Sequence, residues 1–373
     1  MPPDLRELAA GVKSAAAGLG FDLAGIAGVG ERPELDWFGE WIAAGHAGEM
    51  RYLEARNESG ELKRSALAHA APWARSAIVC AANYHTAAPL STGPAPSGAG
   101  WISRYAWGAA DYHDVLLPRL RRLEAHLREE VARRSPGTEL RTWAYVDTGP
   151  VVERVLAKYA GLGWIGKNAC LIHQQKGSWL FLGVILTSMD LPADLPAPDR
   201  CGSCTRCLDA CPTEAFLGPG KLDATRCISY LTIEKRGPIP EELRPGVGRH
   251  VFGCDICQDV CPWNRRATPA AEPAFQPRPG LVNPALDGLA SLDPEEFRRL
   301  FRGSPVKRTR FSGLRRNLAV AMGNSREARF RPHLERLAAD ADPVVAEHAR
   351  WALARLEDRR KERSLGKSAG ERR

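Results

Sequence analysis

Eight of the ten cysteines lie between residues 201 and 261, in a spacing that binds iron–sulfur clusters. One run reads Cys-x2-Cys-x2-Cys-x3-Cys-Pro and ends at Pro212; a second reads Cys-x2-Cys-x3-Cys-Pro and ends at Pro262. In two-cluster ferredoxins the last cysteine of each run ligates the other cluster. The pattern therefore predicts two [4Fe–4S] clusters, one on Cys201, Cys204, Cys207 and Cys261 and the other on Cys211, Cys227, Cys254 and Cys257.

The second run departs from a symmetrical pattern. Its first cysteine is replaced by Val251, and Cys227 is the only cysteine nearby that can complete the set. Zinc is the alternative, because pairs of Cys-x2-Cys make tetrahedral sites of four sulfurs. Two zinc sites would not need the longer run or its partial repeat, so the spacing favours clusters. Cys80, in an apolar run, is expected to be a buried structural thiol, and Cys170 is assigned no function.

Composition limits the classes that remain. The 373 residues are 44% apolar and 26% charged, which is normal for a globular chain with a real core. No apolar run is long enough for a membrane helix, and the N-terminus lacks the features of a secretory signal. We expect a cytoplasmic protein with reduced thiols and no membrane contact. The net charge of +8 favours an anionic partner such as nucleic acid, although basic proteins without such a partner are common.

The chain divides into four regions by pattern. Residues 1–190 alternate helical periods (115–133, 151–160) with short apolar runs (76–82, 179–186), which predicts an α/β or α+β domain. A Pro-rich linker opens a ferredoxin-like region at 191–267. Residues 268–358 end in paired amphipathic helices at 314–324, 330–339 and 343–356, which resemble a HEAT-type repeat; a generic helical bundle is the alternative. The charged residues 359–373 are expected to be disordered.

An electron carrier would not need some 190 residues ahead of its clusters, so we expect a catalytic domain there. The stretch 146–172 is the densest candidate. Asp147 precedes a predicted helix, on a turn that could face a ligand, and Gly161, Gly163 and Gly166 would allow close approach of a large flat cofactor. Ordinary turn and helix-end chemistry explains the same residues equally well.

Four stretches together resemble the epoxyqueuosine reductases. They are DTGPVVERVLAKYAGLGWIGKNACLI from Asp147, SRYAWGAADYHDVL from Ser103, CISYLTIEKRGPIPEELRP from Cys227 and FGCDICQDVCPWNR from Phe252. The resemblance covers residues 1 to about 360. It departs from the family in the second stretch, where Ala109 or Ala110 looks inserted, so ligand contacts there are in doubt.

The resemblance implies a cobalamin-dependent iron–sulfur enzyme, with cobalamin in the N-terminal domain. It would reduce epoxyqueuosine to queuosine at the wobble position of tRNA with a GUN anticodon. An external donor of the flavodoxin or ferredoxin type would feed electrons through both clusters to cob(II)alamin. Asp147 would be the proton donor, and the cofactor contacts would be Arg64, Asp147, Arg154, Asn168, Cys254 and Asp255.

The tRNA is expected to meet a basic surface on Lys235, Arg236, Lys307, Arg308 and Arg315, together with Arg244, Arg249, Arg310 and Arg316. Such phosphate contacts bring affinity rather than base choice. We expect a monomer. Two alternatives stay open at this point: a small-molecule reductase like the reductive dehalogenases, and a ferredoxin-type carrier with no enzymatic activity. His113 and His173 are more simply explained as structural residues than as groups near cobalt.

Overall fold

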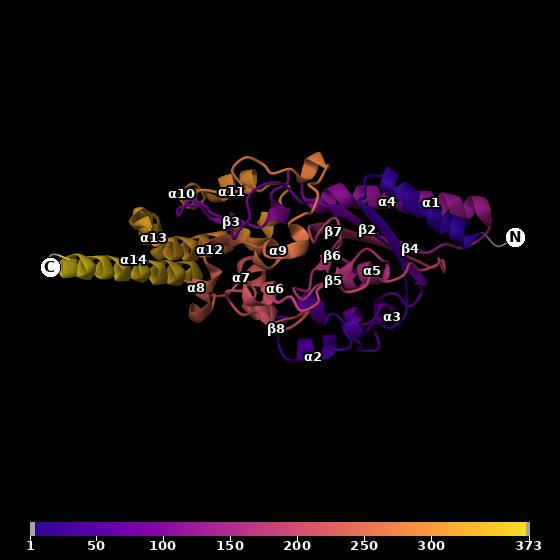
Figure 1. Ribbon diagram of the computed structural model, residues 1–373, viewed down its shortest axis with the longest axis horizontal. Helices are drawn as coiled ribbons and strands as arrows, with labels where there is room; N and C mark the ends of the chain where they lie inside the picture. The colour runs from indigo at the N-terminus through magenta and orange to yellow at the C-terminus, as the bar shows by residue number, and fades with distance from the viewer. Residues whose placement is uncertain (1–3, 371–373) are drawn as a thin grey trace.

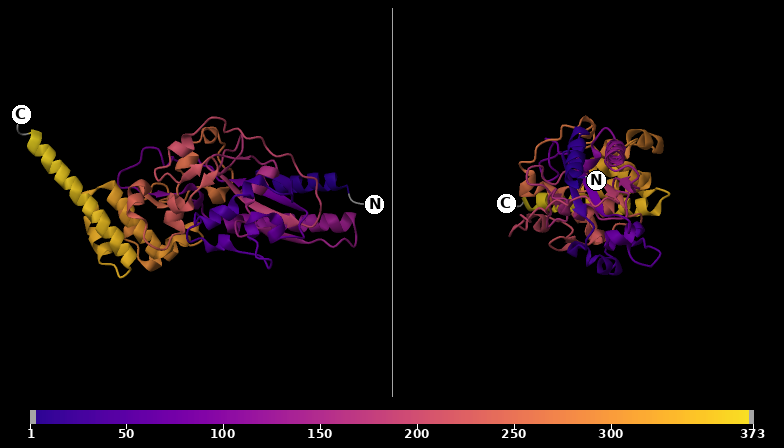
Figure 2. Two further views of the ribbon diagram at one scale, coloured as in Figure 1. Left: turned by 90° about the horizontal axis from the view of Figure 1, so that it is seen from below. Right: turned by 90° about the vertical axis from the view of Figure 1, so that its right-hand side faces the viewer.

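The computed structural model describes the backbone of residues 4–370 and the side chains of residues 4–357. The molecule is elongated, with the N-terminus at one end and helix α14 (Pro343–Gly370) extending from the other (Figures 1 and 2). A sheet with its helices forms the N-terminal half, and the cysteine-rich region lies between this half and the C-terminal helices. Within the described residues, no helix has the length and apolar character needed to cross a membrane.

The N-terminal half is built on a four-stranded sheet. Its order is β1 (Leu23–Gly28), β2 (Ser76–Asn83), β7 (Leu180–Thr187) and β4 (Thr142–Tyr145), and all neighbouring pairs are antiparallel. The two central strands coincide with the apolar runs that predict buried strands. Every residue of β2 is buried, because helices cover both faces of the sheet.

The two helical layers explain this burial. Helices α1 (Leu5–Gly18) and α4 (Tyr112–Arg134) pack on one face, and α5 (Glu153–Tyr159) with the short α3 (Leu67–Ala70) packs on the other (Figure 1). Cys80 of β2 faces the first layer, and burial raises the pKa of its thiol. The predicted mixed α and β architecture is therefore confirmed, and Cys80 is buried as expected.

Further short elements surround the cysteines. They are α2 (Phe38–Ala43), the hairpin of β5 (Trp164–Ile165) and β6 (Leu171–Ile172), α6 (Arg206–Asp209), β8 (Phe216–Gly218), β9 (Lys221–Leu222), α7 (Ile228–Ile233), α8 (Arg244–Val247), β10 (His250–Phe252) and α9 (Ile256–Asp259). Strand β10 pairs in parallel with β3 (Trp101–Ile102), which comes from the N-terminal part of the chain. Trp101 and Trp107 are buried in the C-terminal hydrophobic core. The loop around β3, which belongs to the N-terminal part of the chain, therefore contacts both the cysteine-rich region and the C-terminal helices.

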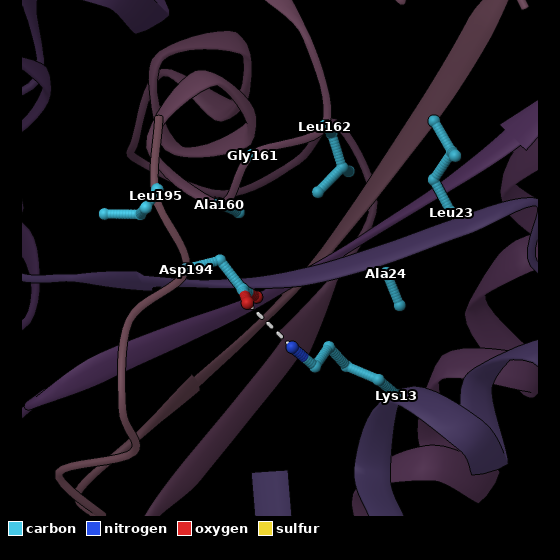
Figure 3. A pocket seen from close by; sticks show the side chains of 8 residues that line it. All are labelled: Lys13, Leu23, Ala24, Ala160, Gly161, Leu162, Asp194 and Leu195. Carbon is cyan, nitrogen blue, oxygen red and sulfur yellow. Dashed lines mark hydrogen bonds and ion pairs between the residues drawn. The ribbon is translucent and has the colours of Figure 1, made fainter. Parts of the chain in front are cut away.

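The Pro-rich linker is anchored rather than free. Asp194 accepts hydrogen bonds from the backbone N–H of Ile26 at 2.9 Å and from the Lys13 ammonium at 2.7 Å. Figure 3 shows this ion pair beside a small surface pocket that the linker forms with β1 and the end of α5. The linker therefore holds a fixed course from the sheet to the cysteine-rich region.

The C-terminal region is helical, as the sequence predicts. Its helices are α10 (Leu286–Ala290), α11 (Pro294–Leu300), α12 (Arg310–Ser325), α13 (Arg331–Ala338) and α14. Residues of α12, α13 and α14 share one buried core. This packing establishes a small helical assembly, while the HEAT-like repeat stays a prediction. Helix α14 continues to Gly370, past the boundary at residue 358 where the sequence predicts a disordered tail; residues 371–373 lie outside the described part.

Candidate active site

Asp147 lies in a turn just beyond the end of β4, at the edge of the sheet. Its φ of 56° is in the left-handed region, which aspartate adopts more readily than most residues. The N–H of Thr148 donates to the carbonyl of Val146 at 2.7 Å and closes the turn. The side chain of Asp147 is 51% exposed. The turn therefore presents a carboxylate that a bound molecule can reach.

Tyr112 holds one oxygen of this carboxylate. Its hydroxyl donates to Asp147 Oδ2 at 2.9 Å. The ring stacks on Phe181 of β7, with the centroids 4.3 Å apart and the planes 5° from parallel. Burial and then the charge of Asp147 raise the pKa of Tyr112 above its ordinary value. The hydroxyl therefore keeps its proton and acts as a donor.

His113 connects Asp147 to a second carboxylate. Asp111 caps α4 and approaches His113 Nδ1 at 2.7 Å, while His113 Nε2 lies 3.8 Å from Asp147 Oδ2. The ammonium of Lys307 lies 3.4 Å from Asp111 Oδ2. Burial raises the pKa of Asp111, but hydrogen bonds from His113 more than offset this and leave it below its ordinary value. Asp111 therefore stays ionised and orients the imidazole.

Arg308 reaches this cluster from the C-terminal region. Its guanidinium lies 3.7 Å from Asp147 Oδ2 and 2.7 Å from Glu234 Oε1. Asp147 belongs to the N-terminal half, Arg308 to the C-terminal region and Glu234 to the cysteine-rich region. Burial lowers the pKa of Arg308, but Glu234 and the other anionic neighbours more than offset this. A charged guanidinium thus stands between the regions and beside the candidate acid.

The basic residues predicted to contact cobalamin support the loops around Asp147. Arg64 donates to the carbonyls of Tyr52 at 2.7 Å and Gly149 at 2.9 Å, the latter in the Asp147 turn. Arg154 donates to the carbonyl of Ala169. In this structure both guanidinium groups therefore hold the backbone that borders the site.

Two buried polar groups beside Asp147 have no protein partner. They are the Tyr145 hydroxyl and Glu153 Oε1. Burial raises the pKa of Glu153 to about 7. A buried polar atom without a partner is costly, and the amide-bearing rim of a corrin offers such partners. The residues present therefore fit a large polar-edged cofactor at this place.

The first predicted cluster set comes together around one cavity. Cys201, Cys204, Cys207 and Cys261 line a space of about 270 Å³. Within the described residues, no three Cys, His, Asp or Glu side chains converge closely enough to hold a single metal ion. Thiols spread around a cavity suit a multi-atom cluster better than one zinc ion.

The second predicted set also borders the N-terminal half. Burial, followed by the charges of Cys227 and Cys211, raises the pKa of Cys254, so these thiols are close neighbours. The Asn168 amide donates to the carbonyl of Cys257 at 3.3 Å. The thiol of Cys170, for which the sequence predicts no role, lies beside that of Cys257. The Asn168 loop therefore joins the catalytic half directly to the second set.

Three groups of predicted site residues lie in surroundings that the sequence does not suggest, and Asp255 is the first. Asp255 is 1% exposed, and its carboxylate accepts from the Ser103 hydroxyl at 2.5 Å and from the Trp101 indole and the Arg104 backbone. Both oxygens of this buried carboxylate therefore already accept hydrogen bonds from the protein, which leaves the predicted cobalamin contact of Asp255 without support from its side chain.

The glycines beside Trp164 also act differently from the expectation. A Cβ at Gly163 would lie 2.2 Å from the carbonyl oxygen of Ile172, and one at Gly166 would lie 2.5 Å from the Ile172 side chain. A Cβ at Gly161 would meet the carbonyl of Leu195 at 2.9 Å. These glycines allow the chain to approach itself, so close approach to a cofactor does not explain them.

Part of the expected basic surface is interior. Arg316 is 1% exposed and donates to the carbonyls of Leu231, Lys235 and Gly237. Arg244 is likewise buried and pairs with Glu347. The prediction that these two face tRNA is wrong, because tertiary packing uses them to satisfy backbone carbonyls and a carboxylate.

The other predicted tRNA residues lie at or near the surface. Lys235 pairs with Glu49 and Arg315 with Asp340. Arg236 donates to the carbonyl of Arg308 at 3.0 Å. Lys307 is 57% exposed. Arg236 and Lys307 therefore lie close to the candidate acid, beside Arg308, while the ion pairs of Lys235 and Arg315 compensate part of their charge.

Sequence reasoning missed three members of the site. Tyr112 stands in a quoted motif without a role, His113 is expected to be a structural residue, and Arg308 is expected only at tRNA. The signal for the first two is the Asp-Tyr-His sequence at the start of a long helix. His173 accepts hydrogen bonds from the N–H groups of Gln175 and Lys176, so it serves a turn, as expected.

Comparisons with known proteins agree with the geometry. Residues 64–148 match the family model of epoxyqueuosine reductase QueG, and residues 200–264 match that of a 4Fe-4S double cluster binding domain. The curated epoxyqueuosine reductase of Pseudomonas aeruginosa is 43% identical over 364 residues, with 95% of this chain and 96% of the relative covered. That of Gloeobacter violaceus is 45% identical, with 87% and 99% covered.

Solved structures agree with this relationship. One is an epoxyqueuosine reductase with an epoxyqueuosine-modified tRNA stem loop, which is 31% identical with a TM-score of 0.81 and covers 95% of this chain and 91% of that chain. Another is from Bacillus subtilis, with its catalytic aspartate loop swung out of the active site; it is 30% identical with a TM-score of 0.80 and the same coverage. With two 4Fe–4S cluster sites and relatives matching over nearly its whole length, this chain belongs to the epoxyqueuosine reductase family.

Proposed function

We propose that this protein reduces epoxyqueuosine to queuosine at the wobble base of tRNA with a GUN anticodon. The observation that carries the proposal is the Asp147 carboxylate, half exposed and held by Tyr112, in a chain with family relatives along nearly its full length. The reaction takes up two electrons and two protons, breaks both carbon–oxygen bonds of the epoxide, forms the alkene and releases water.

Two kinds of cofactor serve this reaction. When bound, the clusters supply single electrons and cobalamin supplies a strongly nucleophilic reducing metal. Each cluster is held by its set of four cysteines described above. Arg64, Arg154, Asn168 and the segment of Cys254 would border the cobalamin, with the two arginines holding the backbone around it, and the unpartnered atoms of Tyr145 and Glu153 would add polar groups.

The chain's own residues handle the proton. Asp147 delivers a proton to the epoxide oxygen, and the Tyr112 hydroxyl fixes the carboxylate oxygen that faces α4. His113, oriented by ionised Asp111, lies close enough to relay a proton to Asp147 through a small shift or one water. Positioned proton transfer of this kind is worth roughly 10²–10⁴ in rate.

The substrate tRNA meets the basic residues beside this site. Lys307, Arg308 and Arg236 lie on the C-terminal side of Asp147, where phosphates next to the anticodon loop can bind. Single-stranded bases can then enter toward Asp147. We further assign the protein to the cytoplasm as a monomer that takes electrons from a flavodoxin or ferredoxin.

The test is anaerobic. Protein with both clusters reconstituted is incubated with cobalamin, a reductant and tRNA carrying epoxyqueuosine, and the digested nucleosides are then analysed by mass spectrometry. Loss of one oxygen atom from the modified nucleoside, dependent on cobalamin, is the expected result. No loss from protein that verifiably holds clusters and cobalamin would overturn the tRNA substrate.

A further inference from the structure

The cavity of the first cysteine set has a rim with only one sign of charge. Besides Cys201, Cys204, Cys207 and Cys261, its lining includes Lys167, Arg200 and Arg206 and no carboxylate. Arg200 and Arg206 are exposed, and Lys167 is half-buried. The cavity is therefore approached through a positively charged border.

Several cations of the N-terminal half are partly neutralised by carboxylates. Lys13, Lys158 and Lys176, for example, each pair with a carboxylate. In the described part of the chain, none of the three rim cations forms such a pair; Lys167 instead donates to the carbonyl of Gly202 at 2.7 Å. That bond holds its charge over the loop between Cys201 and Cys204. The rim charge is thus available to an outside partner.

An aromatic residue completes the border. Trp263 also lines the cavity, and its ring meets Trp164 edge to face with the centroids 5.0 Å apart. Trp164 is buried, so its contact fixes one side of the Trp263 ring. Trp263 itself is only partly buried, which leaves some of its surface open to solvent. A rigid aromatic among cations is a common centre for a protein contact.

The two cysteine sets also face different surroundings. Asn168 borders both sets, and the second set also packs against the apolar residues around α7. The first set borders an opening to solvent. An outside electron carrier that binds at this cationic border would therefore approach the first set.

We propose that Lys167, Arg200 and Arg206, with Trp263, form the docking surface for a small acidic one-electron carrier. This inference rests on the proposed function, because it names the place where the external donor binds. Electron-transfer partners usually form small, transient interfaces, and opposite charge steers their encounter. The donor's cofactor would come to rest over the first cluster.

The experiment compares two double variants with equal changes of charge. Arg200→Glu/Arg206→Glu alters the rim, and Arg121→Glu/Arg122→Glu alters two exposed arginines of α4 as the control. Reconstituted protein without tRNA is mixed with reduced acidic flavodoxin, and bleaching of the cluster absorbance is followed by stopped flow. We expect the rim variant to be reduced ~10- to 100-fold more slowly at low salt and to lose most of its salt dependence. The control should behave like the original protein.

A neutral small reductant, photoreduced deazaflavin, supplies the second measurement. It should reduce all three proteins at similar rates, and redox titration followed by electron paramagnetic resonance should give similar cluster potentials. An unchanged flavodoxin rate would overturn the docking surface. Equal slowing with both reductants, or a shifted potential, would show that the cations act on the cluster itself. Inhibition by unmodified tRNA through the same residues would assign the surface to RNA. No tRNA substrate takes part in these rate measurements. They therefore test the docking surface even if the proposed tRNA reaction fails.

Discussion

The Tyr112 hydroxyl and the Asp147 carboxylate are joined by a 2.9 Å hydrogen bond between the start of α4 and the turn after β4. Phe181 of the central sheet supports the Tyr112 ring. The bond joins two motifs that are 35 residues apart in sequence. It gives the candidate acid a fixed direction despite its exposure, and several predictions depend on it.

Asp147→Asn should abolish turnover while cofactors remain bound. The amide has nearly the same shape but cannot donate a proton to the epoxide oxygen, so we expect a loss of at least ~10²-fold in single-turnover rate. Cluster absorbance and retained cobalamin are the controls. Full activity in this variant would remove Asp147 from the mechanism.

Tyr112→Phe should preserve the stack on Phe181 and release Asp147. We expect roughly a tenfold lower rate and a loss of about 1 kcal/mol in the free energy of unfolding, which is typical of one hydrogen bond. Tyr105→Phe is the matched control, since the Tyr105 ring also lies beside Tyr112 but its hydroxyl makes no hydrogen bond to Asp147. Equal effects of both substitutions would argue against a positioning role.

Arg308→Gln should weaken tRNA binding about tenfold and reduce the dependence on salt by about one phosphate contact. It should also lower the rate at saturating tRNA, because the guanidinium lies 3.7 Å from Asp147. Arg310→Gln, at an exposed neighbouring position, is expected to affect binding without the change in rate. Binding is measured by anisotropy of a labelled stem loop at several salt concentrations.

Cys227→Ser should remove one cluster and leave the other. Iron content should fall by about half, because Cys227 completes only the second set in the two-cluster arrangement. Cys170→Ser is the control: its thiol lies beside that of Cys257 but is outside the predicted ligands, so both clusters should remain. Loss of a cluster from the control and not from Cys227→Ser would exchange their roles.

Stability should fall as the pH drops below neutrality, in part through His348. Burial lowers the pKa of His348 from 6.5 to about 4, and its Nε2 accepts from the Ile239 N–H at 3.0 Å. Between these two values the unfolded chain binds the proton and the native chain does not, so stability rises with pH there. The loss for His348 should reach about 2 kcal/mol at pH 5.

The same reasoning applies to His250, whose pKa burial lowers to about 4. The raised pKa of Glu153 acts in the opposite direction, so a comparison of variants is needed. His348→Gln, which cannot titrate, should show a flatter loss of stability between pH 7 and pH 5 in anaerobic denaturant unfolding. An unchanged slope would show that His348 does not contribute.

The sequence by itself determined the cluster chemistry and the family, because cysteine spacing and adjacent motif residues are local properties that the chain carries in any conformation. It also determined the central strands, since uninterrupted apolar runs must be buried. The same locality explains the correct prediction of Asp147 as a turn residue with access to a ligand.

Only the tertiary structure decided which charges are free. Arg308 and Arg316 look alike in sequence, yet one lies at Asp147 and the other is buried on three backbone carbonyls. The glycines near Trp164 likewise serve contacts with Ile172 and Leu195 rather than a cofactor. Such roles depend on partners distant in sequence, which packing alone brings within hydrogen-bonding or van der Waals distance.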